Sequence, residues 1–121
     1  MLKITVRRDK DGKIVTYSAA GHCNYNEPGK DIVCSATSAL LQTAVLGVYK
    51  ERVDAKACIK RGGLKIDLPD DMKLKEKAKF QIIFEAIFLG LKEIEKQYPA
   101  NVSITEVFEK EVEEEKVEIK E

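Results

Sequence analysis

One histidine and one cysteine are spaced so that they could form a nucleophilic pair. The only histidine, His22, lies twelve residues before Cys34 in the segment GHCNYNEPGKDIVC. Cys34 lies where a long uncharged helix is predicted to begin, and a helix N-terminus carries unpaired backbone N–H groups and a partial positive charge. That setting favours a thiolate, and an imidazole in the preceding loop could accept the thiol proton. The two residues therefore predict a cysteine nucleophile with its own general base.

Two residues close to this pair are candidates for supporting roles. Asp31 is a good N-cap, because its carboxylate can accept hydrogen bonds from the first turn of the helix, where Cys34 lies. A second role for Asp31, orienting His22, stays open. Ser38 follows Cys34 by one helical turn and is expected on the same face, where its hydroxyl either bonds back to the helix carbonyls or contacts the site.

The reaction expected of the pair is attack of the Cys34 thiolate on a carbonyl carbon, with backbone N–H groups around Cys34 holding the oxyanion. Gly21 and Gly29 bracket the loop that carries His22, either as simple terminators or as hinges of a lid. A metal site would need His22, Cys23 and Cys34 as ligands, but the chain has no CxxC or HxxxH pair. We therefore expect neither a metal nor a cofactor.

Strand and helix patterns surround this segment in a defined order. Alternating and turn residues predict strands at 2–7, 14–20, 55–60 and 64–68, a strand near residues 102–104, a helix from 32 to about 50, and a second helix from the Pro69-Asp70-Asp71 segment to Pro99. The order β-β-α-β-β-α-β predicts an α+β fold with a mixed or mainly antiparallel sheet packed with two helices. Apolar residues surround most of the first helix, so we expect it to be nearly fully buried, covered by the sheet and by another helix or a second subunit. We expect Cys58 to be a core residue of its strand.

The 121 residues are enough for one domain and a tail. We place the domain at residues 1–108 and a charged acidic tail at 109–121, which holds seven Glu and three Lys; since the whole chain is neutral, the domain carries about +4. The tail is either a solvated extension or an added edge strand. We expect a cytoplasmic protein, because the first residues show no signal-peptide pattern. Polar residues interrupt the first helix, so we expect no membrane span, and the odd number of cysteines predicts reduced thiols.

The segment GHCNYNEPGKDIVCSATSAL resembles the signature of the ribosomal-processing cysteine protease family. Members of that family show Gly-His, a short glycine-containing loop and then Asp-Ile-Val-Cys followed by small residues and a serine. The matching positions are Gly21, His22, Gly29, Asp31, Ile32, Val33, Cys34 and Ser38. Cys23 departs from the pattern, since a small residue such as alanine is common there. An inhibitory disulfide between Cys23 and Cys34 would require their Cα atoms to lie within ~7 Å.

The resemblance, which covers roughly residues 1–108, implies a cysteine endopeptidase that removes a short N-terminal extension from a large-subunit ribosomal protein. It implies Cys34 as nucleophile, His22 as base, a homodimer, and a loop that orders over an extended peptide with an apolar or aromatic residue before the cut. We expect the reaction to need no nucleic acid and no membrane.

Two other functions remain open. One is a non-catalytic ribosome- or RNA-associated binding domain, although the basic residues are scattered along the sequence without interleaved aromatic residues. The other is a thiol redox sensor with Cys23 as the resolving cysteine.

Overall fold

A computed structural model of the chain describes residues 1–51 and 55–109, so the tail lies almost wholly outside the described residues. The elements follow the predicted order, which confirms the α+β fold. The strands are β1 (Leu2–Arg8), β2 (Ile14–Ala20), β3 (Lys56–Lys60), β4 (Gly63–Asp67) and β5 (Val102–Phe108), and the helices are α1 (Ile32–Lys50) and α2 (Leu74–Gln97).

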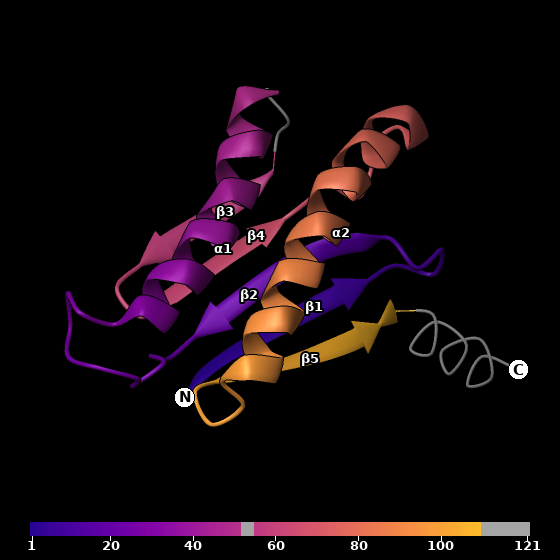
Figure 1. The fold of residues 1–121 in the computed structure, drawn as a ribbon. Coiled ribbons are helices and arrows are strands. Elements are labelled where there is room, and N and C mark those ends of the chain that lie inside the picture. The colour runs from indigo at the N-terminus through magenta and orange to yellow at the C-terminus, as the bar shows by residue number, and fades with distance from the viewer. Residues whose placement is uncertain (52–54, 110–121) are drawn as a thin grey trace, which may run out of the picture.

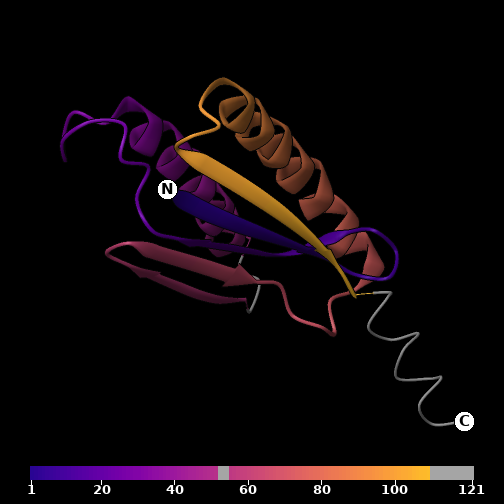
Figure 2. The same cartoon turned by 90° about the horizontal axis from the view of Figure 1, so that it is seen from below.

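The five strands form one mixed sheet in the order β3-β4-β2-β1-β5. All neighbours are antiparallel except β1 and β5, which are parallel. Figures 1 and 2 show that both helices lie on the same face of this sheet, side by side. The described part of the chain therefore has two layers, and one face of the sheet is left without a helix.

The alternation in β1 explains how the layers meet. Leu2, Ile4 and Val6 are buried on the helical side, whereas the residues between them are exposed. Burying apolar surface in this way stabilises the fold by about 25 cal/mol per Å². Tyr17 from β2 is fully buried against Phe84 of α2, with ring centroids 5.5 Å apart, and its hydroxyl donates to the Phe84 carbonyl oxygen at 2.6 Å.

The second helix begins later than the sequence predicted, at Leu74 and not in the Pro69-Asp70-Asp71 segment. The backbone N–H of Leu68 donates to Val15 O at 2.9 Å, so the chain still follows the sheet immediately before Pro69. Residues 69–73 then carry the chain from the sheet to the helical layer. The predicted start was wrong because turn residues that suit a helix N-terminus are used here for that connection.

Two predictions about burial are also wrong for the single chain. α1 packs its buried stripe on the sheet and on α2, but Ile32, Leu46 and Tyr49 stay 60%, 67% and 66% exposed, so the helix is not nearly fully buried. By length and composition α1 would be apolar enough to cross a membrane, yet this stripe belongs to the core. Cys58 is exposed because its register places it on the face of the sheet that has no helix.

Candidate active site

Asp31 joins the start of α1 to the loop that precedes it. Its backbone is extended, and its Oδ1 accepts from the Cys34 N–H at 2.9 Å. Its Oδ2 accepts from the N–H groups of Tyr25 and Asn26 at 3.0 and 3.3 Å. Burial tends to raise the pKa of this carboxyl, but the backbone hydrogen bonds outweigh that effect and hold the pKa below its usual value. The predicted N-cap is therefore confirmed.

These contacts also correct the expectation about the oxyanion. The Cys34 N–H is occupied by the Asp31 carboxylate, and the Ser35 N–H donates to the Asp31 carbonyl oxygen at 3.0 Å. The prediction that N–H groups around Cys34 are free to hold an oxyanion is wrong for these two groups. The reason is that the acidic N-cap side chain occupies the Cys34 N–H, while the Ser35 N–H already forms a backbone hydrogen bond of the helix.

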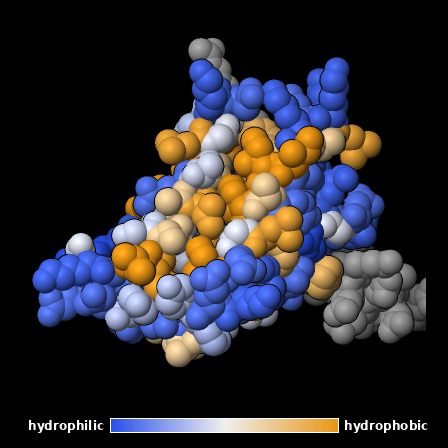
Figure 3. All heavy atoms as spheres, in the orientation of Figure 1, coloured by the Kyte–Doolittle hydropathy of each residue, from blue (hydrophilic) through white to orange (hydrophobic). Residues whose placement is uncertain are grey.

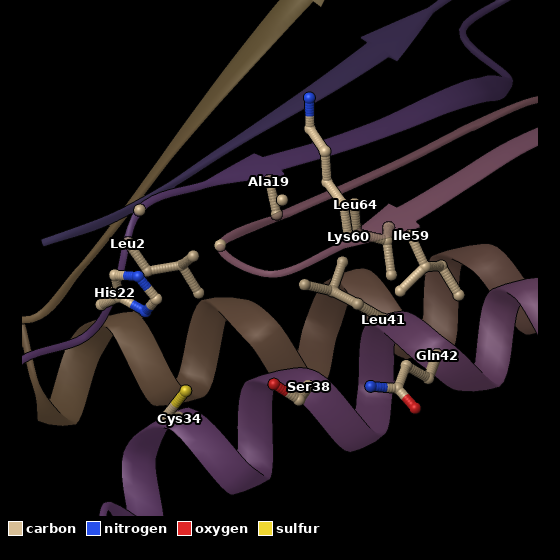
Figure 4. A pocket seen from close by; sticks show the side chains of 13 residues that line it. Leu2, Ala19, His22, Cys34, Ser38, Leu41, Gln42, Ile59, Lys60 and Leu64 are labelled. Carbon is tan, nitrogen blue, oxygen red and sulfur yellow. The ribbon is translucent and has the colours of Figure 1, made fainter. Parts of the chain in front are cut away.

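His22 and Cys34 face the same cavity, whose volume is about 210 Å³. His22 comes from the segment that follows β2, and Cys34 comes from the first turn of α1. Figure 4 shows the imidazole on one side of this space and the Cys34 sulfur opposite it. Within the described chain no hydrogen bond joins them, an arrangement that is common in sites without substrate. The fold thus brings the two predicted residues to one site.

A second cavity of about 410 Å³ adjoins the same two side chains. Its wall comes from the loop between β2 and α1, including Asn24, Asn26 and Gly29, and from Arg61 in the turn between β3 and β4. His22 and Cys34 therefore lie between two open spaces. An extended peptide could occupy both spaces while its scissile bond crosses the sulfur.

The first cavity is mainly apolar, and much of its wall was not predicted. Ser38 lines it, as expected from its position one turn after Cys34. The β3–β4 hairpin supplies Ile59, Lys60 and Leu64, which the sequence had marked only as parts of a second hairpin. The other lining residues are Leu2, Ala19, Gly21, Leu41, Gln42, Gly62 and Gly63. No local sequence signal links this hairpin to His22 and Cys34, which lie much earlier in the chain.

Glycines at two places allow the chain to approach the site closely. Gly62 has φ +76°, and a Cβ there would lie 3.3 Å from His22 Nε2. Gly21 has φ +98°, and a Cβ there would lie only 2.6 Å from the Met1 carbonyl oxygen. Gly29 also has positive φ, but the space around it is open. All three positions suit glycine, while the predicted hinge role of Gly21 and Gly29 stays a prediction.

Cys23 is a core residue next to the site. It is 1% exposed, its sulfur lies 3.7 Å from Thr37 Oγ1, and burial raises the pKa of its thiol. Asn101 Nδ2 donates to the Cys23 carbonyl oxygen at 2.9 Å, which ties this end of the loop to the segment before β5. A thiol with a raised pKa reacts slowly, and the disulfide with Cys34 stays a prediction.

The alternative to a catalytic pair is a metal site formed by His22, Cys23 and Cys34. Within the described residues no group of three or more His, Cys, Asp or Glu side chains is arranged to hold a metal ion. His22 and Cys34 are instead placed on opposite sides of a cavity that is open to a substrate.

A model of the family described as Cysteine protease Prp matches residues 1–103. This chain belongs to the Prp family of cysteine proteases. The ribosomal processing cysteine protease Prp of Bacillus subtilis strain 168 is 27% identical over 110 residues, which are 87% of this chain and 96% of that protein. The protein of the same name from Staphylococcus aureus strain Mu50 is 27% identical over 107 residues, or 86% and 97% of the two chains. Prp enzymes are hydrolases, so the enzyme class expected from the sequence is confirmed.

Solved structures show the same fold. The ribosomal processing protease Prp from S. aureus, crystallised with a covalently linked product peptide, has a TM-score of 0.76 at 23% identity and covers 88% of this chain and 99% of its own. SMU.848 from Streptococcus mutans has a TM-score of 0.71 at 30% identity, with 89% and 95% covered. The fold class that the sequence predicted is therefore the fold of this family.

Proposed function

We propose that this Prp family member is a cytoplasmic endopeptidase that removes a short N-terminal extension from a large-subunit ribosomal protein, with Cys34 and His22 as its catalytic dyad. The observation that carries the proposal is the shared cavity between His22 and Cys34. The product peptide covalently linked to the S. aureus relative supports chemistry in which enzyme and peptide become joined.

In the proposed mechanism His22 accepts the proton of Cys34, and the thiolate attacks the scissile carbonyl carbon. The C–N bond of the tetrahedral intermediate breaks, and the imidazolium gives its proton to the leaving amine. Water, deprotonated by His22, then hydrolyses the thioester and releases the new carboxyl group and the thiol. The partial positive charge at the start of α1 stabilises the thiolate form of Cys34. The negative charge of the Asp31 carboxylate disfavours that form, but the three N–H groups that donate to the carboxylate offset part of its charge.

The two cavities suggest how a peptide would lie. The apolar cavity lined by Leu41, Ile59 and Leu64 suits the apolar or aromatic residue expected before the cut. The larger cavity on the loop side is also mainly apolar, and the amide groups of Asn24 and Asn26 in its wall can hydrogen-bond to the backbone of the remaining peptide. The loop is held by Cys23 in the core, by Tyr25, whose ring packs edge-on against Tyr98 with centroids 5.3 Å apart, and by the contacts of Asp31. The exposed residues after Asn26 are therefore the part of the loop that can adjust around a bound peptide.

The proposal is tested with a fluorogenic peptide that has an aromatic residue before the cut and with three matched variants. Cys34→Ser and His22→Ala are expected to lower kcat/KM by about 10³-fold or more, because each removes a member of the dyad. Cys58→Ser is the control, since Cys58 is exposed on the face of the sheet without helices. Wild-type cleavage by either dyad variant would refute the assignment.

Alkylation distinguishes the dyad from the choice of substrate. We expect iodoacetamide to modify Cys34 at a lower pH in the wild type than in His22→Ala, because the imidazole takes the thiol proton. Mass spectrometry separates this reaction from modification of Cys58. Identical pH profiles for the two proteins would contradict the dyad, whatever the peptide sequence used.

We further propose that the enzyme is a homodimer formed through its helical face. Figure 3 shows a continuous apolar area over α1 and α2, where Leu46, Tyr49, Ile82 and Leu89 are each at least 66% exposed. An apolar patch that spans two helices is costly to leave in water and suits a second copy of itself. The double variant Ile82→Lys/Leu89→Lys is expected to sediment as a monomer. Val107→Lys, on the opposite face, should leave the dimer intact, and a monomeric wild type would refute the proposal.

A further inference from the structure

We propose that the face of the sheet that neither helix of the described residues covers binds the phosphate backbone of RNA, independently of the peptidase site. The face is defined by strand register. Lys60, Gly63, Ala20, Lys3 and Ser103 form one row across β3-β4-β2-β1-β5. Cys58, Lys65, Ser18, Thr5 and Thr105 form the next row, and Lys56, Asp67, Thr16, Arg7 and Val107 form the third. Paired residues point to the same side of a sheet, and both helices lie on the other side (Figure 2).

The charge on this face is strongly one-sided. Five basic side chains belong to it, and all of them are exposed: Lys3, Arg7, Lys56, Lys60 and Lys65. The only acid in the three rows is Asp67, whose Oδ1 accepts from the Thr16 hydroxyl at 2.6 Å and whose Oδ2 lies 3.7 Å from Lys65 Nζ. These basic residues belong to three strands that are far apart in the sequence, β1, β3 and β4, and the sheet gathers them on one face. The resulting surface is complementary to a polyanion.

The charge is also unevenly distributed along the strands. At the end where β4 finishes, Asp70 and Asp71 border a hollow of about 490 Å³ together with Arg7, Lys56 and Lys65. No acid belongs to the two rows that contain Lys3, Lys60 and Lys65. Net positive charge is therefore concentrated on the half of the face near the end of β2, where the chain enters the loop between β2 and α1. A bound polyanion would lie there, across the sheet from the catalytic cavity.

The remaining side chains on the face decide between kinds of polyanion. The hydroxyls of Thr5, Ser18, Ser103 and Thr105 lie in the same rows as the basic groups, and such hydroxyls contact phosphates and sugars. The three rows hold no aromatic side chain, and Val107 is their one aliphatic side chain larger than alanine, so apolar anchors for a membrane surface are lacking. Without aromatic residues the face cannot stack bases, and binding is expected to be independent of sequence. RNA is chosen over DNA because the proposed substrate is a ribosomal protein.

The test is fluorescence anisotropy of the full-length protein with a labelled mixed-sequence RNA of about 20 nucleotides, longer than the ~4–16 nucleotides that one small domain covers. Affinity should fall steeply with salt, with a log–log slope of about −0.7 for each phosphate contacted. In Lys3→Gln/Lys56→Gln/Lys65→Gln the affinity at low salt should drop about tenfold or more, and the slope should become shallower by about 2. Lys60 is left unchanged because it also lines the catalytic cavity.

The matched control is Lys10→Gln/Lys75→Gln/Lys96→Gln, which removes three exposed lysines elsewhere and changes the net charge equally. It should bind RNA like the wild type. Absence of RNA binding at about 50 mM salt, or equal weakening in both triple variants, would overturn the proposal. Tighter binding to phosphatidylserine vesicles than to RNA would overturn it in favour of a membrane surface. Both triple variants should cleave the peptide normally, and Cys34→Ser should bind RNA normally, so this proposal and the peptidase proposal fail separately.

Discussion

At the end of the molecule far from Cys34, the Arg8 side chain is 11% exposed and each of its guanidinium nitrogens donates a hydrogen bond. It donates to both oxygens of Glu85 at 2.7 and 2.8 Å, to Glu106 at 2.9 Å and to the Gly12 carbonyl oxygen at 2.8 Å, and it lies 5.1 Å from the centre of the Phe88 ring. At the other end His22 is exposed and forms no hydrogen bond within the described residues. The two ends of the same hairpin are therefore built in opposite ways.

The far end holds two more paired groups. Asp9 is buried, forms an ion pair with Lys77, and accepts from the N–H groups of Asp11 and Lys13 at 2.9 and 3.0 Å. Gln81 accepts from the Ile14 N–H at 2.7 Å and donates to the Ile14 carbonyl oxygen at 2.8 Å. The difference teaches that the stability of this small domain is concentrated away from the site. The end that holds the candidate site can then leave the His22 side chain unpaired for a substrate.

The largest expected effect comes from breaking the paired end. Arg8→Met keeps most of the stem that packs near Phe88 but leaves Glu85 and Glu106 without their partner. We expect the free energy of unfolding to fall by about 2–3 kcal/mol, less than for a fully buried pair because Glu85 is 41% exposed. Urea unfolding at pH 7 measures the loss, and folded protein should keep wild-type kcat/KM.

The control for that variant is Lys79→Met, which breaks an exposed ion pair with Glu51. Its cost should stay below about 0.5 kcal/mol. Equal losses in the two variants, or a loss of kcat/KM in folded Arg8→Met, would contradict the separation between the two ends.

A pair of glycine variants sharpens the comparison. Gly62 near the site and Gly12 at the far end have φ of +76° and +80°, so alanine at either should cost about 1–2 kcal/mol of unfolding free energy. Only at Gly62 would the new Cβ crowd His22, because nothing lies within 4 Å at Gly12. We expect kcat to fall about tenfold in Gly62→Ala and to be unchanged in Gly12→Ala, measured by peptide cleavage. Equal kcat values for Gly62→Ala and Gly12→Ala would show that the turn between β3 and β4 does not position the His22 imidazole.

The smallest effect is expected from Asp31→Asn, which keeps one acceptor for Cys34 N–H and weakens the hold on the loop. The cost at pH 6 should be about 1 kcal/mol. Because the folded-state pKa of Asp31 is lowered, its contribution is present above the usual carboxyl pKa near 3.8 and is lost as the pH falls through the lower folded value. Urea unfolding of both proteins from pH 6 to pH 3 should show the difference shrinking. A difference that grows on acidification would contradict this role.

Local patterns predicted most of the fold and the centre of the site. Period-two alternation located β1, and the Asp31 cap located the start of α1, because both signals lie within a few residues of the element they define. The start of α2 was misplaced, since turn residues do not reveal whether a chain still has to cross between layers. Cys58 was assigned to the core because a strand pattern does not say which face will be covered by helices.

The sequence by itself determined the two candidate residues of the proposed dyad: a histidine in a glycine-bounded loop and a cysteine three residues after a capping aspartate, both recognisable from neighbouring residues alone. Only the tertiary structure decided what surrounds that pair. It brought Gly62 against the imidazole, occupied the Cys34 N–H with the Asp31 carboxylate, and gathered distant lysines on one face of the sheet. The physical reason is that strand pairing and register join residues far apart in the chain, and no local pattern encodes those partners.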